Sequence, residues 1–291
     1  MRAVRRLVLL ACVAGVAGCK SKTEEPAPTP ASAATTPTPP AATTTATTTT
    51  ATGSPRPSGS ARKSGLAGLT AVEILTENAP ADDALPMVVA LHEEHTRAET
   101  IASLFAHQEA RTRLLAFRAP IVKSDTAAAW FPTLEEVHGD VDAYSRGIRE
   151  VTERLAFTLT EAKKKRSTWG KPIVVGISQG GIVALELALT HPEHAGNVLV
   201  VGSILPRPLW PEKRDVDASY PKITFFHTLD DEIIRYADAQ TFHDKLRSMG
   251  FPVRLKHFAG PHDYTFAIRL KLHDDLQEAI KETAAGDRFP R

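Results

Sequence analysis

Three short motifs in the chain hold side chains that can do chemistry together. Ser178 lies in Gly176-Ile177-Ser178-Gln179-Gly180, which fits G-x-S-x-G, and Asp230-Asp231 and His262 follow it along the chain. A serine oxygen becomes a nucleophile when a histidine takes its proton, and a carboxylate orients that histidine and stabilises its charged form. These residue types therefore predict acyl transfer through a covalent serine intermediate.

Ser178 falls between a predicted strand and a predicted helix. Ile173–Val175 is an apolar, β-branched run typical of a buried parallel strand, and Ile182–Leu189 has apolar residues at helical spacing. A sharp strand-to-helix turn would expose the serine oxygen and point the backbone N–H of Gln179 into the same space. Such a turn requires small residues two positions before and after the serine. The alternative is a glycine-rich turn in which Ser178 only caps the helix.

Both partner motifs come just after predicted strands. Asp230 and Asp231 follow Lys222–His227, and His262 follows Pro252–His257. Active sites of open α/β sheets lie beyond the carboxyl ends of the strands, and the α/β-hydrolase triad runs in the order serine, acid, histidine. Alternatively, acidic residues before a helix complement its dipole, and a lone loop histidine is merely polar. The residues alone do not separate Asp230 from Asp231.

With these motifs in place, the domain resembles the phospholipase/carboxylesterase family, the acyl-protein thioesterase-like branch of the α/β hydrolases. The resemblance extends over essentially all of the chain from Leu66 onward. The residues that carry it are Ala90-Leu91-His92, Trp130-Phe131, Gly176-Ile177-Ser178-Gln179-Gly180-Gly181, His227-Thr228-Leu229-Asp230-Asp231-Glu232-Ile233-Ile234 and Gly260-Pro261-His262. In the family pattern the acid falls four residues after the histidine that opens its motif, which selects Asp231. The resemblance implies a carboxylic-ester substrate, with thioesters and lysophospholipids as further options, and no cofactor.

The loop after the first buried strand departs from the family pattern. Where the family has glycine, this chain has Glu93-Glu94. In the family this loop supplies the second N–H of the oxyanion hole, so we expect a backbone donor near Glu93 or Glu94 to join that of Gln179. A carboxylate in this place would oppose a developing oxyanion unless it points away or pairs with a cation such as Arg97.

Two further motifs near this loop have competing interpretations. The run His92-Glu93-Glu94-His95 is not H-E-x-x-H, because its histidines are three residues apart, and no other ligand set is evident; we expect no metal. Trp130-Phe131, in the loop before the long helix, is expected to line the acyl pocket. The alternative is an aromatic plug under a loop.

Strands and helices alternate from Leu66 onward. The expected strands are Leu69–Thr76 at an edge, Pro86–Leu91, Thr112–Arg118, Ile173–Val175, Asn197–Val201, Lys222–His227 and Pro252–His257. The expected helices are Arg97–Ala110, Asp140–Lys165, the helix after Ser178, Ile233–Met249 and Tyr264–Thr283. We therefore predict the α/β-hydrolase fold, a mostly parallel sheet with helices on both faces.

Residues 1–18 are typical of a bacterial lipoprotein signal peptide. Positive charges precede an apolar run that is too short to span a bilayer and that ends in Val16-Ala17-Gly18-Cys19, which resembles a lipobox. In such signals the chain is cut before the cysteine, so Cys19 would be acylated and would hold the protein at a membrane; the alternative is an ordinary secretory signal. Residues 19–65 are rich in Ala, Thr and Pro, typical of a disordered tether, and residues 66–291 form the hydrolase domain. Lys20 rather than Asp after the cysteine favours the outer over the inner membrane, with the domain outside the cytoplasm.

Charge and cysteine content narrow the function classes. The formal net charge is +1, without a large basic patch, which argues against nucleic acid as a partner. The two cysteines are Cys12 and Cys19, so the mature chain has no thiol pair for a disulfide. We expect a serine hydrolase of carboxylic esters, tethered to the cell envelope. The alternative is a catalytically weak or inactive lipoprotein of the same fold that binds a ligand or partner, which the Glu93-Glu94 loop favours. The sequence identifies neither the acyl group nor a partner protein.

Overall fold

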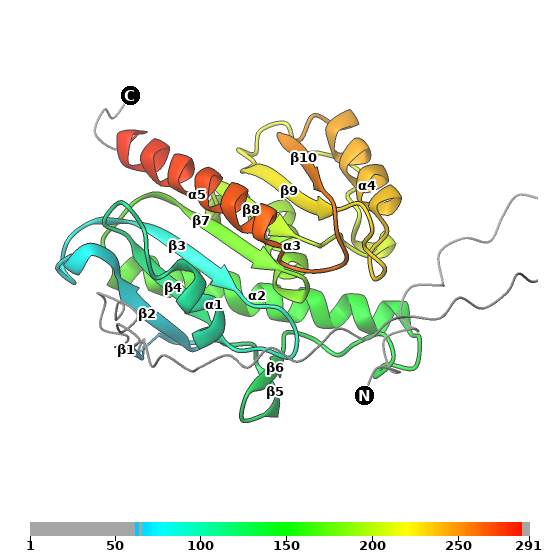
Figure 1. The fold of residues 1–291 in the computed structure, drawn as a ribbon, viewed down its shortest axis with the longest axis horizontal. Coiled ribbons are helices and arrows are strands. Elements are labelled where there is room, and N and C mark those ends of the chain that lie inside the picture. The colour runs from blue at the N-terminus through cyan, green and yellow to red at the C-terminus, as the bar shows by residue number, and fades with distance from the viewer. Residues whose placement is uncertain (1–61, 64–65, 287–291) are drawn as a thin grey trace, which may run out of the picture. The chain divides into compact units, whose positions relative to one another are not determined.

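The computed structural model describes residues 62–63 and 66–286. The expected signal peptide, Cys19 and nearly all of the expected tether lie outside these residues. The described part of the chain forms an eight-stranded sheet with helices on both faces (Figure 1). Within residues 62–63 and 66–286, no helix combines the length and the apolar character needed to cross a bilayer.

The sheet is mostly parallel, as the alternation of elements predicts. Across it the strands run in the order β1-β2-β4-β3-β7-β8-β9-β10; β2 is antiparallel to both its neighbours and the other pairs are parallel. The strands are β1 (Arg62–Lys63), β2 (Ala71–Leu75), β3 (Leu85–Leu91), β4 (Arg113–Phe117), β7 (Thr168–Ile177), β8 (Asn197–Val201), β9 (Lys222–Thr228) and β10 (Val253–Phe258), and a separate hairpin pairs β5 (Ile121–Ser124) with β6 (Ala127–Ala129).

Five α-helices cover the sheet in the described part of the chain. They are α1 (Ala98–Phe105), α2 (Val141–Lys165), α3 (Gln179–Thr190), α4 (Tyr236–Ser248) and α5 (Phe266–Gly286), with short 3-10 turns at Thr76–Asn78, Pro192–His194 and Arg207–Leu209. One hydrophobic core joins α2, α3 and α4 to one face of the sheet, and a second joins α1 and α5 to the other. In Figure 1, α5 accordingly crosses in front of the sheet while α2 runs behind it. The predicted fold class is confirmed.

Strand β3 shows why these residues form a central strand. All of its residues are buried, and successive side chains point to opposite faces of the sheet. Met87 and Val89 join the core beneath α2 and α3, whereas Val88 and Ala90 join the core beneath α1 and α5. A strand covered on both faces needs apolar residues at consecutive positions, which is the pattern read from the sequence.

Some element ends differ from the expected ones, each for a local reason. The strand expected at an edge is β2, but β1 pairs outside it. The helix expected to reach Ala110 ends at Phe105, where the side-chain amide of Gln108 donates to the Phe105 carbonyl at 2.8 Å. Helix α4 begins at Tyr236 rather than Ile233, because the residues before it form a turn around a carboxylate described below.

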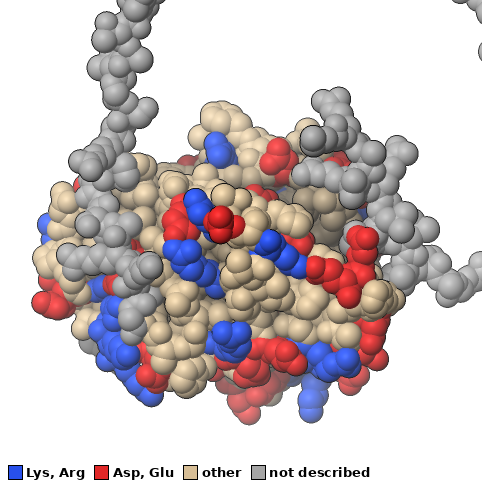
Figure 2. Space-filling view, turned by 90° about the horizontal axis from the view of Figure 1, so that it is seen from below, with Lys and Arg blue, Asp and Glu red and all other residues tan. Residues whose placement is uncertain are grey.

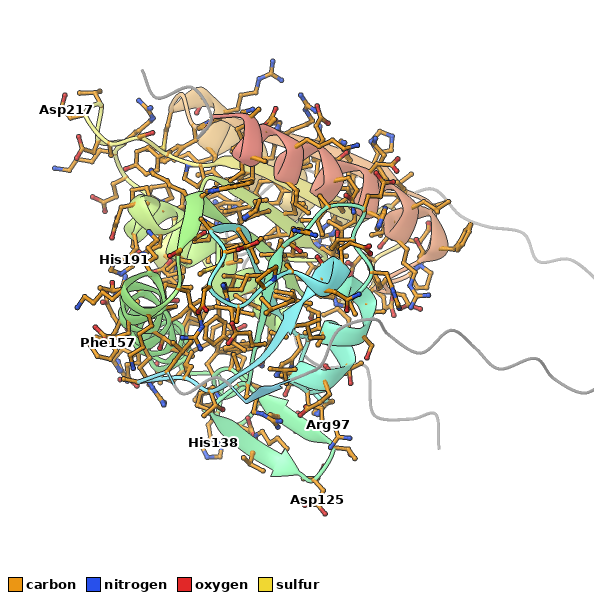
Figure 3. All side chains as sticks on the ribbon, turned by 90° about the vertical axis from the view of Figure 1, so that its left-hand side faces the viewer. Arg97, Asp125, His138, Phe157, His191 and Asp217 are labelled. Atoms are coloured by element: carbon orange, nitrogen blue, oxygen red, sulfur yellow. The ribbon has the colours of Figure 1, made fainter. Side chains whose placement is uncertain are left out.

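The β5–β6 hairpin was not expected from the sequence. Its strands are short, and most of β5 is exposed. The hairpin lies against the β3–α1 loop: the His95 N–H donates to the Ala128 carbonyl at 3.2 Å, and Nη1 of Arg97 donates to the Asp125 carbonyl at 2.8 Å. Figure 3 shows Arg97 beside the hairpin and Asp125 at its tip. The hairpin therefore fixes the loop in which the Glu93-Glu94 departure occurs.

Charged side chains of both signs are interspersed over the face shown in Figure 2. This mixture matches the near-zero net charge of the chain. The residues expected to do chemistry lie just beyond the carboxyl ends of the parallel strands β3, β7, β8, β9 and β10.

Candidate active site

Ser178 occupies a strained turn between β7 and α3. Its φ of 50° and ψ of −118° lie outside the regions that side chains other than glycine normally adopt. The glycines around it are required by space: a Cβ at Gly176 would lie 2.5 Å from the Gly180 carbonyl oxygen, and a Cβ at Gly180 would lie 2.2 Å from that of Leu91. The turn has the geometry that the G-x-S-x-G spacing predicts.

Ser178, His262 and Asp231 form a continuous chain of hydrogen bonds. The Ser178 Oγ lies 3.3 Å from His262 Nε2, and His262 Nδ1 lies 2.7 Å from Asp231 Oδ2. Because an ionised carboxylate only accepts, Nδ1 carries the proton and Nε2 is left with a lone pair that faces the serine. The ring is thus in the tautomer that can take the serine proton.

Asp231 is a buried carboxylate held by donors on both oxygens. Its side chain is fully buried, and Oδ1 accepts the N–H groups of Ile233 at 2.9 Å and Ile234 at 2.7 Å. Burial alone would raise the pKa of Asp231, but the hydrogen bond and charge of His262 and the Ile234 N–H bring the pKa below its ordinary value. The carboxylate therefore stays ionised beside His262.

The two neighbours of Asp231 bind the loop that carries His262 rather than its ring. Oδ2 of Asp230 accepts the Gly260 N–H at 3.2 Å, and Oε2 of Glu232 accepts the His262 N–H at 3.1 Å. Three consecutive carboxylates thus fix the loop, with only Asp231 in contact with the imidazole. Of the two aspartates left open by the residues alone, Asp231 lies next to His262.

The expected oxyanion donors lie on two segments that touch. Gln179 is the first residue of α3, so its N–H has no acceptor within the helix. Gly180 packs directly on the carbonyl groups of Leu91 and His92, which brings the start of α3 against the loop that carries Glu93 and Glu94. The two segments are therefore neighbours, and the oxyanion hole formed by Gln179 with a donor near Glu93 or Glu94 stays a prediction.

Glu93 and Glu94 have different surroundings. Glu93 is exposed and lines a pocket beside His262. Glu94 is partly buried and lies 3.5 Å from the His95 ring, and burial raises the pKa of its carboxyl above the ordinary value. Arg97, the cation considered as a partner for this loop, lies 4.0 Å from Glu99 and also donates to the hairpin.

Trp130, Phe131 and the side chain of Gln179 form one buried unit. Oε1 of Gln179 accepts the Trp130 N–H at 2.9 Å, and the indole N–H donates to the His92 carbonyl at 2.7 Å. Trp130 and Phe131 are each 1% exposed and belong to the core on the α2 side. These positions favour an aromatic plug, and the assignment of Trp130 and Phe131 to the acyl pocket stays a prediction.

His92 is a structural contact in this unit. Its Nδ1 lies 2.7 Å from the Glu93 carbonyl, and its Nε2 accepts the Ala119 N–H at 3.2 Å. Both ring nitrogens are thereby occupied, and burial lowers the pKa of the ring. Among the residues that the structure describes, no set of three side chains is arranged to hold a metal ion.

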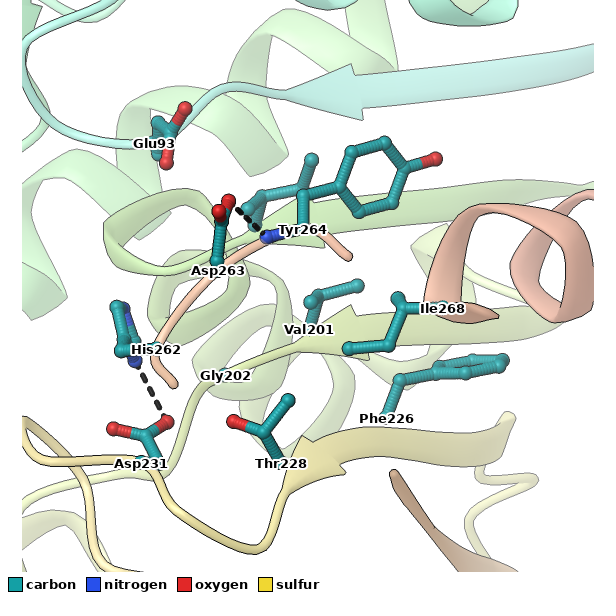
Figure 4. A pocket seen from close by; sticks show the side chains of 11 residues that line it. Glu93, Val201, Gly202, Phe226, Thr228, Asp231, His262, Asp263, Tyr264 and Ile268 are labelled. Atoms are coloured by element: carbon teal, nitrogen blue, oxygen red, sulfur yellow. Dashed lines mark hydrogen bonds and ion pairs between the residues drawn. The ribbon is translucent and has the colours of Figure 1, made fainter. Parts of the chain in front are cut away.

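A small pocket lies beside His262 (Figure 4). Its floor is apolar, and its rim carries the carboxylates of Glu93 and Asp263; the Asp263 side chain points towards the Glu93 loop. The residues that line it include Ile177, Val201, Gly202, Phe226, Thr228, Tyr264 and Ile268. Ser178 is not among the residues that line this pocket.

Two residues after β8 contribute to the site without having been predicted. A Cβ at Gly202, whose φ is +56°, would lie 2.9 Å from Cε1 of His262. The Ser203 hydroxyl donates to the Ser178 carbonyl at 2.9 Å, below the strained turn. The only signal in the sequence was a glycine directly after an apolar strand, which by itself does not reveal a contact with His262.

The comparisons with known proteins identify a family for the chain. About half of the chain, residues 118–266, matches the family model described as Phospholipase/Carboxylesterase. The matched range is narrower than the resemblance expected from Leu66 onward, and the Glu93-Glu94 loop lies outside it. No curated protein sequence matches the chain.

Solved structures show the same fold at low sequence identity. Esterase PE8 is 24% identical over 70% of this chain and 98% of its own, with a TM-score of 0.58. A Bacillus cereus carboxylesterase is 17% identical over 73% of this chain and 95% of its own, with a TM-score of 0.58. Zea mays acyl-protein thioesterase 2 is 18% identical over 69% of this chain and 96% of its own, with a TM-score of 0.53.

The fold and the matching family model together define an α/β hydrolase. Within that class, the chain belongs to the phospholipase/carboxylesterase family.

Proposed function

We propose that this protein is a serine hydrolase that cleaves carboxylic esters through an acyl-Ser178 intermediate. The observation that carries the proposal is the hydrogen-bonded series Ser178–His262–Asp231, with the serine on a strained turn at the carboxyl edge of the sheet. Strain in the backbone costs on the order of 1–3 kcal/mol and is retained where function requires it. A glycine-rich turn that only caps a helix needs neither this strain nor the two partners.

The reaction follows from the positions of the three side chains. Ser178 Oγ bonds to the ester carbonyl carbon while His262 Nε2 takes its proton; the bond to the leaving alcohol then breaks, and His262 returns the proton to that oxygen. Water attacks the acyl-serine with His262 again as the base, which releases the acid and restores the serine. Asp231 holds the ring and stabilises its charged form between these steps. The N–H of Gln179 and one near Glu93 or Glu94 stabilise the oxyanion.

The substrate range is part of the proposal. The buried positions of Trp130 and Phe131 support short acyl groups over long ones. Thioesters and lysophospholipids with accessible carbonyls can react by the same steps. The expected signal peptide and Cys19 support a lipid anchor in the bacterial envelope, with residues 19–65 as a tether. Lys20 after the cysteine supports the outer membrane over the inner one.

One observation favours a second candidate function. Glu93 lines the pocket beside His262, where a carboxylate opposes the negative charge that develops on the substrate. A catalytically weak protein of this fold that binds a ligand or partner would tolerate that carboxylate. Such a protein would also keep its biological role when Ser178 is replaced by alanine.

Hydrolysis of a p-nitrophenyl ester series by the full-length protein separates the two candidates. If the protein is a serine hydrolase, turnover should be highest for acetyl or butyryl esters and should be abolished in Ser178→Ala. A folded wild-type protein without turnover across the series would favour the binding role instead.

A further inference from the structure

His227 is a fully buried histidine next to the proposed triad. It lies in β9, one residue before the end of that strand, and its side chain is 0% exposed. Its Nε2 is 2.7 Å from the Ile234 carbonyl oxygen and 3.3 Å from Oδ2 of Asp231. The ring thus touches the same carboxylate oxygen that accepts from His262.

The surroundings of His227 fix its protonation. A carbonyl only accepts, so Nε2 carries the hydrogen and donates it to Ile234, and an ionised carboxylate 3.3 Å away favours the same tautomer. Nδ1 is buried and has no partner among the described residues, so a second proton there would be left without an acceptor. Burial lowers the pKa of His227 below its ordinary value, although the Ile234 carbonyl and Asp231 oppose that effect. His227 is therefore a neutral donor.

This donor completes a closed arrangement around Asp231. Ile234 gives its N–H to Oδ1 of Asp231 and takes the His227 N–H at its carbonyl, so the turn between residues 231 and 234 is fastened at both ends. Oδ2 accepts from His262 Nδ1, and His227 Nε2 lies 3.3 Å from the same oxygen while it donates to Ile234. These contacts define one position of the carboxylate relative to the imidazole of His262.

We propose that His227 is a positioning residue that holds the turn carrying Asp231, and with it Oδ2, in line with His262 by donating from Nε2 to the Ile234 carbonyl. The proposal rests on the proposed serine-hydrolase function, since it acts through the same acid and base. Removing the donor frees the carboxylate to turn and strengthens its hold on the imidazolium, because the negative charge on Oδ2 is then less compensated. The base should accordingly take up its proton at a higher pH.

A role in packing alone would respond differently to the choice of substitution. His227 also faces the Tyr236 ring, with ring centroids 6.3 Å apart, and the Tyr236 ring lies 5.8 Å from that of His257. His257 is the register partner of His227 on β10. If His227 only filled space, replacements of similar size would behave alike, whichever atom carries a donor.

The substitutions can place the donor at one ring position or the other. A glutamine side chain brings an N–H₂ group to the place of Nε2, and an asparagine brings it only to the place of Nδ1, which has no partner among the described residues. Leucine removes the donor and keeps the bulk. His257→Leu is the control for the contact with Tyr236, because it changes the other histidine beside that ring, at an exposed position, without touching Asp231.

The test measures the pH profile of kcat/KM and thermal unfolding of the full-length protein and of His227→Gln, His227→Asn, His227→Leu and His257→Leu. We expect His227→Asn and His227→Leu to lose roughly tenfold in kcat, about the effect of one buried hydrogen bond, with KM little changed. Their acid limb should move up by about 0.5 to 1 pH unit. His227→Gln and His257→Leu should stay close to the wild type. Equal losses in the Gln, Asn and Leu variants, or losses that follow only the melting temperature, would overturn the proposal.

A second readout keeps this test separate from the proposed function. Proton NMR of the His262 ring follows its protonation directly and needs no turnover. An inactive wild-type protein would defeat the proposed hydrolase, yet the His262 titration would still show an upward shift in His227→Leu and none in His227→Gln. An unshifted titration in both variants would refute the positioning role even in an active enzyme.

Discussion

Gly202 offers a sharp perturbation of the site, because the space that its missing side chain would fill is taken by His262. A Cβ at this position would lie 2.9 Å from Cε1 and 3.3 Å from Nδ1 of the imidazole. Ordinary contacts begin near 3.4 Å, so in Gly202→Ala the ring must move by roughly 0.5 Å or more, away from the place where it meets both Ser178 and Asp231. The Ser178–His262 distance of 3.3 Å is already long for a hydrogen bond. We expect kcat to fall by about 10- to 100-fold, the scale of a displaced catalytic group.

Backbone strain must be separated from this displacement. Gly202 has a φ of +56°, and an alanine in that region costs about 1–2 kcal/mol, partly offset by the lower entropy of its unfolded chain. Gly250 is the matched control: its φ is +84° and a Cβ there would meet nothing within 4 Å. Gly250→Ala should therefore show the cost of the strain without the overlap, lose no more unfolding free energy than Gly202→Ala, and keep its activity.

The assay is the steady-state hydrolysis of p-nitrophenyl acetate beside urea unfolding of both variants. Similar stability with activity lost only in Gly202→Ala would support the placement of His262. Full activity in Gly202→Ala, or equal activity losses in the two variants, would refute the reasoning.

Three further predictions follow from the charged groups. Asp231→Asn should lower kcat for p-nitrophenyl acetate by about 10⁴-fold, since the tautomer of the imidazole is lost. Asp230→Asn alters only a contact to Gly260 and should lower kcat a few-fold at most. Equal losses in the two variants would contradict the assignment of Asp231 as the acid. Glu186 is buried in α3 with its nearest cation, Arg149, 4.0 Å away, and burial raises the pKa of its carboxyl from 4.5 to about 7. Between pH 4.5 and about 7 the folded state then binds more protons than the unfolded state, so the wild type should lose up to about 3 kcal/mol of unfolding free energy as pH rises through this range. Glu186→Gln should not show this loss. Urea titrations in which both proteins follow parallel pH curves would contradict the prediction. If the Glu93 carboxylate opposes the oxyanion, Glu93→Gly should raise the turnover of neutral esters several-fold, and Glu94→Gly tests the neighbouring carboxylate in the same way. Unchanged turnover in both variants would refute this repulsion.

The sheet and its helices could be predicted because the hydrophobic pattern of each element lies in consecutive residues. The buried strands are unbroken apolar runs, and the long helix has an apolar stripe with Asp140 accepting from Asp142 and Ala143 at its start. The turn at Ser178 could be predicted for the same reason, since its close contacts fall on glycines two residues away.

What the sequence did not show depends on contacts between distant segments. Gly202, Ser203 and Glu232 act on Ser178 or His262 only because their strands end side by side. The side chain of Gln179 reaches Trp130, which is 49 residues away, and no local pattern encodes that bond. The start of α4 moved because Asp231 takes the N–H groups of Ile233 and Ile234.

The β5–β6 hairpin could not be predicted from the sequence for a different reason. Its strands Ile121–Ser124 and Ala127–Ala129 are too short for a clear alternation, and alanine and lysine are weak strand formers. The hairpin is held instead by contacts with the β3–α1 loop, including the pairing of Thr96 with Ala128. Such an element follows from the fold around it.

The most direct test of the central claim is covalent labelling of the full-length protein with a fluorophosphonate, read by intact mass and peptide mapping. The account predicts one adduct per chain, on Ser178, with none in Ser178→Ala and much slower labelling in Asp231→Asn. A folded wild-type protein that takes up no label, or one labelled equally well without Ser178, would contradict the assignment of Ser178 as the nucleophile.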